Sequence, residues 1–206
     1  MLLIDDYKVA YLHINKTGGT SIKQHLVDIT HPAHAIQMGP THGPLASKVR
    51  LLGERFYDYT ILTSIRNPYA RLLSIYLFRR RRFKDGEEAP AMKAAHGLPF
   101  KRWFVETIKH STRLTDLSIS DSILIEGMLP DNVYLVAVES LTKDIDRFVK
   151  DVMEIGTDKQ VPHVNRTDLI KGHHKKYYDS EMAQLVHEWD KWVIDNYYPW
   201  SVDNYF

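Results

Sequence analysis

Two short segments of the 206-residue chain carry residues whose types and spacing suit the binding of anions. In the first, KTGGTS, Lys16 precedes a glycine pair, which lets backbone N–H groups turn toward one point, and a following helix N-terminus adds positive potential there. Lys16 reaches the same anion as a point charge, and hydroxyl groups follow the glycines. The run predicted to bind phosphate is Lys16, Thr17, Gly18, Gly19, Thr20 and Ser21.

The second segment is TSIRNPYARLLSIY, in which Ser74 follows Arg66 by eight residues. In a helix that begins just after Arg66, this spacing corresponds to about two turns. Taken alone, Arg66 suits a surface ion pair and Ser74 an ordinary helix position. Together, and in this order after KTGGTS, they are predicted to converge on a second phosphate.

The elements that must position these residues alternate between strands and helices. Residues 9–14 form a nearly continuous apolar run that predicts a buried strand, and helical spacing of apolar residues follows the glycines, with Thr20 or Ser21 available as N-cap. Residues 59–65 and 133–138 predict two further strands, each followed by a helix. We therefore expect an α/β fold, a three-layer P-loop-like arrangement with a central parallel sheet flanked by helices.

The remaining segments contain few strand signals. Residues 79–128 are expected to be helical with loops, and Ser180 is available to cap a helix that continues through Val193. The aromatic residues 197–200 are expected to pack. With 44% hydrophobic residues, the chain can build a substantial core, so residues 1–206 are predicted to form a single domain.

The two anion segments resemble those of PAPS-dependent sulfotransferases, in particular the carbohydrate branch that includes Golgi-type, bacterial and family-2-like enzymes. HINKTGGTSI is similar to the loop HIPKTGGTS that binds the 5′-phosphosulfate, with Asn15 in place of proline, and RNPYARLLSIY to the 3′-phosphate signature RNPYDRLxSxY, with Ala70 in place of aspartate. Weaker similarities are VYLVAVESL, VPHVNRT and the C-terminal helix. The resemblance implies transfer of a sulfuryl group from PAPS to a hydroxyl, with a saccharide as the expected acceptor.

Such a reaction needs a cation at the leaving oxygen and a base for the acceptor hydroxyl. Lys16 is the candidate cation. His42 is the candidate base, since it lies between the two motifs where related enzymes carry a histidine, although a surface or packed His42 is an equal alternative. His13 is a weaker candidate that could hold the backbone, and Glu139 could serve as a base or tether a loop, the latter being favoured.

Other polar segments could border the site. Arg79, Arg80, Arg81, Arg82 and Lys84 form a basic run that suits either a solvated helix face or guidance of an acidic glycan or the donor. Asn165 and Arg166 are candidate substrate contacts, and residues 173–176 (HHKK) suit an ordinary polar loop or the edge of the site.

Composition excludes several function classes. The formal charge of +1, from 27 Lys and Arg against 26 Asp and Glu, gives no field for nucleic acid. There is no cysteine, hence no disulfide or thiolate site. No apolar stretch is long enough for a membrane span and the N-terminus lacks the pattern of a signal peptide, so we expect a soluble, cytoplasmic protein. No metal is predicted, and the sequence leaves the oligomeric state open.

Two alternative functions stay open at this point. A P-loop kinase that phosphorylates a small molecule with ATP would share the fold class. In the motif of such kinases the lysine follows the glycines, whereas Lys16 precedes them here. A catalytically inactive relative could bind PAP, the desulfonated donor, or a sulfated glycan.

Overall fold

The computed structural model describes residues 1–110, 118–162 and 173–204. The chain divides into two compact units. The first contains Met1–Arg66 and a second segment that starts at Asp121, and the second contains Asn67–Ser120 and the C-terminal residues. Each unit has its own hydrophobic core.

The first unit is built on a five-stranded mixed sheet in the order β3-β1-β2-β4-β5. Its strands are β1 (Leu2–Ile4), β2 (Val9–Leu12), β3 (Ala35–Gln37), β4 (Thr60–Ile65) and β5 (Val133–Ala137). The strands β2, β4 and β5 are parallel, with Tyr11 opposite Leu62 and Leu62 opposite Tyr134. Since β1 pairs antiparallel with both β2 and β3, strand β3 runs in the same direction as β2.

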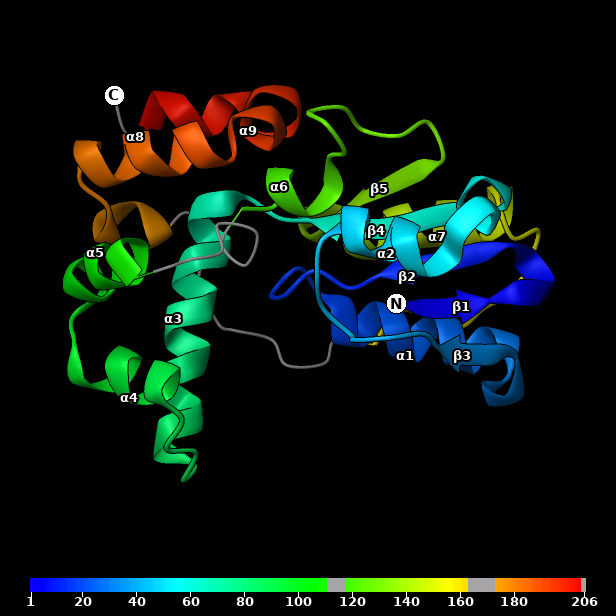
Figure 1. Ribbon diagram of the computed structural model, residues 1–206, viewed down its shortest axis with the longest axis horizontal. Helices are drawn as coiled ribbons and strands as arrows, with labels where there is room; N and C mark the ends of the chain where they lie inside the picture. The colour runs from blue at the N-terminus through cyan, green and yellow to red at the C-terminus, as the bar shows by residue number, and fades with distance from the viewer. Residues whose placement is uncertain (111–117, 163–172, 205–206) are drawn as a thin grey trace. The chain divides into compact units, whose positions relative to one another are not determined.

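Helices cover both faces of this sheet, as Figure 1 shows for α1 and α2. The helices α1 (Gly19–Thr30) and α7 (Leu141–Asp151) pack on one face, and α2 (Leu45–Leu52) with the 3-10 helix η3 (Gly53–Asp58) packs on the other. Alternate residues of each strand face opposite layers, as the two-residue period of a strand requires. The first unit therefore has the three layers expected from the sequence.

The predicted α/β class is confirmed, but the sheet is mixed rather than parallel throughout. The three strands expected at residues 9–14, 59–65 and 133–138 correspond to β2, β4 and β5, each one or two residues shorter. The strands β1 and β3 were not predicted. Both have three residues, and such runs are too short for their alternation to be recognised.

Two predicted helix starts were wrong by one to three residues. The N-cap of α1 is Gly18 rather than Thr20 or Ser21, and its φ of 79° lies in the left-handed region that glycine adopts readily. The helix α8 (Ser180–Trp189) is capped by Asp179, whose carboxylate accepts from the Met182 N–H at 2.9 Å. A separate helix, α9 (Lys191–Tyr197), follows it.

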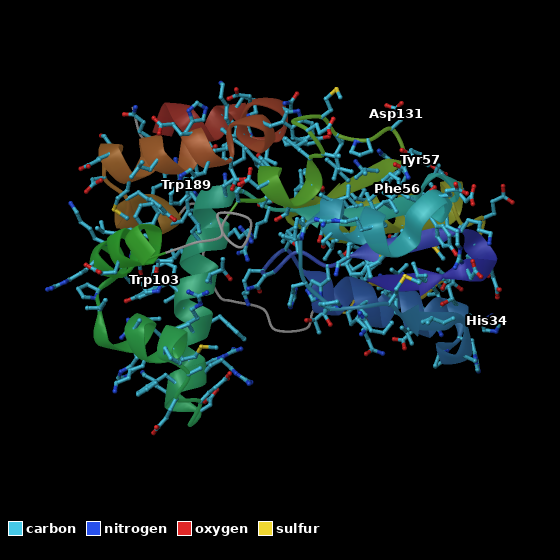
Figure 2. The ribbon with its side chains drawn as sticks, in the orientation of Figure 1. His34, Phe56, Tyr57, Trp103, Asp131 and Trp189 are labelled. Atoms are coloured by element: carbon cyan, nitrogen blue, oxygen red, sulfur yellow. The ribbon has the colours of Figure 1, made fainter. Side chains whose placement is uncertain are left out.

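The second unit is largely helical. It contains α3 (Pro68–Lys84), α4 (Pro90–Gly97), α5 (Phe100–His110), α8 and α9, and the short helix α6 (Ser120–Ile123) starts at its boundary. Further 3-10 turns in the chain are η1 (Asp5–Tyr7), η2 (Pro32–His34), η5 (Val138–Ser140), η6 (His173–Tyr177) and η7 (Pro199–Asn204). The aromatic core of the second unit includes Trp103, which is labelled in Figure 2 and is 1% exposed. Trp189 stacks on Phe104 at 6.0 Å between ring centroids.

The buried carboxylate of Asp190 joins the two chain segments that make up the second unit. Asp190 accepts from the Ser120 N–H at 2.8 Å and from the Ser118 hydroxyl at 3.1 Å. Burial raises the pKa of Asp190, while the positive charge of Arg71 and these hydrogen bonds act in the opposite direction. Arg71 is itself buried, so the two charges compensate each other inside the core.

The C-terminal aromatic residues are only partly packed, which corrects the expectation from the sequence. Tyr198 is buried, but Tyr197 and Trp200 are 42% and 54% exposed. Among the helices of the described residues, none combines the length and the apolar composition needed to cross a bilayer.

Candidate functional site

The candidate residues of the first unit gather at one edge of its sheet. The strands β2, β3 and β4 run in the same direction, so the segments that follow them leave at the same edge. The loop with Lys16 follows β2, the segment with His42 follows β3, and Arg66 follows β4 directly. The carboxyl edge of parallel strands is where ligands bind in α/β folds.

The segment after β2 makes a tight turn into α1. Lys16 has a φ of 64°, a left-handed conformation that costs a non-glycine residue about 1 kcal/mol or more. The Arg66 guanidinium donates from Nη1 to the Lys16 carbonyl at 3.3 Å and so helps to hold this conformation. The predicted phosphate-binding lysine and the predicted 3′-phosphate arginine are therefore in direct contact.

Thr17 anchors the loop from inside the unit. Its side chain is fully buried, and its hydroxyl donates to the Ile14 carbonyl at 2.8 Å. Because that proton is already used, the buried Ser64 hydroxyl must donate to Thr17 Oγ1, 2.9 Å away. The Thr17 side chain therefore fixes the loop to β4, and only its backbone N–H is available for an anion.

Neighbouring side chains leave little room for a Cβ atom at either glycine of the pair. A Cβ on Gly18 would lie 3.3 Å from a methyl group of Leu141, and a Cβ on Gly19 would lie only 1.9 Å from the His13 ring. The imidazole of His13 thus occupies the space that a side chain at Gly19 would need. Of the two hydroxyl residues that follow, Thr20 is exposed and Ser21 is 5% exposed.

His42 contacts the same loop through His13. Its Nδ1 lies 3.2 Å from the His13 carbonyl, and the two imidazole centroids are 4.5 Å apart. A carbonyl oxygen only accepts, so Nδ1 carries the proton in the neutral ring and Nε2 keeps its lone pair. The His42 side chain is exposed, which leaves Nε2 accessible to a substrate.

His13 stays uncharged at neutral pH. Burial lowers the pKa of its imidazole to about 4, and the charges of His42, Lys23 and Lys16 act in the same direction. Its Nδ1 is buried without a hydrogen-bond partner among the described residues, which fits a neutral ring. His13 therefore forms an apolar contact between the phosphate loop and His42 rather than a second base.

The other predicted residues are distributed differently. Ser74 is completely buried in α3 of the second unit, so its convergence with Arg66 on one phosphate stays a prediction. Asn165 and Arg166 lie outside the described residues. Glu139 is exposed in η5, directly after β5, and the HHKK segment lies in η6.

The basic run ends α3, where Arg79 and Arg80 lie half-buried against aromatic rings and Arg81, Arg82 and Lys84 are exposed to solvent. The guanidinium of Arg79 lies 5.8 Å from the Trp103 ring centroid, and that of Arg80 lies 5.4 Å from the Tyr76 ring. Arg82 pairs with Glu87. The stems of these arginines contribute packing as well as charge.

Sequence reasoning missed Ser64 and Lys48 as residues that support the site. Ser64 carries no motif, and only the fold brings it to Thr17. Lys48 had a visible signal, because it lies on the same helical face as the apolar residues Leu45 and Leu52. A lysine on a buried face has to hydrogen-bond something inside the protein.

No group of three or more His, Asp or Glu side chains in the described part of the chain could hold a metal ion. The prediction of a metal-independent reaction stays a prediction.

Comparison with known proteins agrees with this geometry. The model of the sulfotransferase family matches residues 1–195, which includes both anion segments and His42. Comparisons with curated proteins and with solved structures gave no match. Because the match extends over nearly the whole chain, and the loop after β2 and the arginine after β4 have the order and setting expected, the protein belongs to the sulfotransferase family.

Proposed function

We propose that the protein is a PAPS-dependent sulfotransferase that transfers a sulfuryl group to a sugar hydroxyl, with His42 as the base. The observation that supports it best is the convergence of Lys16, Arg66 and His42 at the carboxyl edge of the sheet, linked by the hydrogen bonds Arg66–Lys16 and His42–His13. Residues 1–206 then act as one functional domain.

Donor binding is assigned to the loop after β2 and to Arg66. The backbone N–H groups of residues 17–19 and the N-terminus of α1 suit the 5′-phosphosulfate, with further donors from Thr20 and Ser21. The helix has no side-chain cap among the described residues, so its first N–H groups suit an anion. The guanidinium of Arg66 is assigned to the 3′-phosphate, and the contribution of Ser74 there stays a prediction from the sequence.

In the reaction, an acceptor oxygen forms a bond to sulfur while the bond from sulfur to the bridging phosphate oxygen breaks. His42 Nε2 takes the hydroxyl proton, since its tautomer leaves the lone pair there. The negative charge that develops on the leaving oxygen lies beside the Lys16 ammonium, whose attraction grows as the bond breaks. The products are the sulfated acceptor, PAP and a protonated His42.

The neutral ring of His13 favours this assignment of roles. A charged imidazole 4.5 Å from His42 would oppose the uptake of a proton by its neighbour. Because burial keeps the pKa of His13 at about 4, that opposition is absent at neutral pH.

Calorimetric titration with PAP tests donor binding, with ATP and Mg²⁺ in parallel. We expect PAP to bind without metal, and the variant Arg66→Ala to bind it roughly 10- to 150-fold more weakly, the equivalent of about 1.5–3 kcal/mol for hydrogen bonds to a charged group. Arg147→Ala, on the exposed face of α7, is the matched control and should bind normally. Binding of ATP–Mg²⁺ without binding of PAP would favour a kinase.

The acceptor and the base are tested by turnover. Labelled PAPS is incubated with a panel of mono- and oligosaccharides, and transfer of label is measured for the wild type and for His42→Ala. We expect His42→Ala to bind PAP normally and to lose turnover by about 100-fold or more, since a positioned general base typically contributes about 100- to 10,000-fold. Lys16→Ala should also lose turnover. A His42→Ala protein with full turnover would refute the base, and a PAP-binding wild type that modifies no acceptor would indicate an inactive relative.

A further inference from the structure

We propose that Lys48 is a positioning residue for His42, which fixes the loop that carries the base without contacting the substrate. This inference rests on the proposed function of His42. It concerns a residue outside the two anion segments, which contacts the His42 loop from α2.

The contacts of Lys48 span this loop. The side chain comes from α2 and is 1% exposed, and its Nζ donates to the Pro40 carbonyl at 2.7 Å and to the His42 carbonyl at 3.3 Å. A Cβ built on Gly43 would lie 3.7 Å from the same Nζ. One ammonium group therefore holds two carbonyls of this loop, and one of them belongs to the candidate base His42.

The charge of Lys48 has no other evident use. Among the described residues no carboxylate forms an ion pair with it, and burial lowers the pKa of its ammonium. Burying an ammonium without a counter-ion is unfavourable, and an apolar side chain would complete the face of α2 formed by Leu45 and Leu52 without that cost. What the ammonium adds is two directed hydrogen bonds to the loop.

The loop requires such an anchor because its own backbone is easily deformed. It is flanked by Gly39 and Gly43, with φ of 61° and 130°, conformations in which glycine has wide freedom. The hydrogen bond from His42 Nδ1 to the His13 carbonyl fixes the ring, but it cannot fix the main chain that carries the ring. The Met1 ammonium also holds the start of this loop, at the Met38 and Pro40 carbonyls (3.2 and 3.1 Å), and Lys48 adds the constraint on the His42 carbonyl itself.

The test is a double-mutant cycle with His42. Lys48→Met keeps the length and apolar bulk of the side chain and removes both donors, and Lys150→Met, an exposed lysine of α7, is the matched control. We expect Lys48→Met to lower kcat by about 100-fold, the effect of a misplacement of roughly 1 Å in a catalytic group. The PAP Kd should change by less than about 2-fold, and Lys150→Met should match the wild type in both.

The decisive measurement is the residual turnover of His42→Ala with and without the Lys48 substitution. If Lys48 acts through His42, Lys48→Met costs nothing further once the imidazole is absent. An equal further loss in the His42→Ala background, a parallel loss of PAP binding, or a normal kcat for Lys48→Met would each overturn the inference.

The outcome also separates this inference from the proposed function. If His42→Ala keeps full turnover, the base assignment itself fails. If His42→Ala is inactive and the cycle is additive, the base stands and Lys48 has a different role. Should Lys48→Met fail to fold, the same cycle with Lys48→Gln, whose shorter side chain cannot keep both hydrogen bonds, decides between these outcomes.

Discussion

A single methyl group added at Gly19 should disturb both the phosphate loop and the candidate base. In Gly19→Ala the new Cβ would lie 1.9 Å from Cδ2 and 2.0 Å from Nε2 of His13, whereas contacts of Cβ atoms in proteins essentially never fall below 3.0 Å. The ring must therefore move by about 1 Å or more, or the loop must move away from it. His13 is a difficult residue to displace, because its ring lies between Tyr11 and His42.

Two opposing effects set the magnitude of the change in stability. Alanine is favoured over glycine in a helix by up to about 1 kcal/mol, and overpacking of a close contact costs about 1–3 kcal/mol. We expect a net loss of about 1–2 kcal/mol, a fall in Tm of roughly 2–8 °C for a chain of this length. Turnover and PAP binding should both fall, turnover by about 100-fold, since a displacement near 1 Å reaches His42 through the ring.

Differential scanning calorimetry, PAP titration and turnover measure these three effects. Gly156→Ala is the control, because a Cβ there meets nothing within 4 Å. In the double variant His13→Ala/Gly19→Ala the clash is gone, so part of the lost Tm should return. A Gly19→Ala protein with the Tm, PAP affinity and turnover of the wild type would refute the account of this contact.

Two further predictions concern buried ionisable groups. The pKa of His13 is lowered from 6.5 to about 4, so the unfolded chain binds more protons than the folded chain between these pH values. The free energy of unfolding should therefore fall by up to about 3 kcal/mol as the pH falls from 7 to 4. Urea unfolding at pH 7 and pH 5 should show a smaller loss of stability in His13→Gln than in the wild type, and equal losses would contradict this prediction. Asp190→Ala removes a buried negative charge that interacts electrostatically with buried Arg71, together with the acceptor for Ser120, and should cost about 3–5 kcal/mol in urea unfolding. A loss below about 1 kcal/mol would show that Arg71 does not depend on this charge.

Local chemistry allowed the strand, glycine turn and helix around Lys16 to be predicted from the sequence, while the role of this loop in donor binding stays a prediction. A buried apolar strand followed by two glycines admits few conformations, and the apolar spacing of Ile22 and Leu26 fixes the direction of the helix that follows. The α/β class followed from three such units. The family resemblance added the roles of Arg66 and His42.

The supporting contacts could not be predicted, because they join residues far apart in the chain. Ser64 meets Thr17 only after β2 and β4 pair, and the contact of His13 with Gly19 depends on the angle at which α1 leaves the sheet. The short strands β1 and β3 form because they complete a sheet edge, not because of their own three-residue patterns. Thr20 was expected to cap α1 because hydroxyl residues usually do, but a left-handed glycine provides the turn here.

The order of strands in the sheet places the two halves of the candidate site on different strands. The donor loop and Arg66 follow the central strands β2 and β4, which pair with each other, whereas the His42 loop follows β3, an edge strand that pairs only with β1. Insertions or exchanges in residues 38–44 leave every hydrogen bond of β2 and β4 in place, since loops at an edge tolerate changes in length that central strands do not. Under the proposed function, changes in the His42 loop would alter the acceptor side of the site and leave the donor side in place, provided that the main chain stays within reach of Lys48.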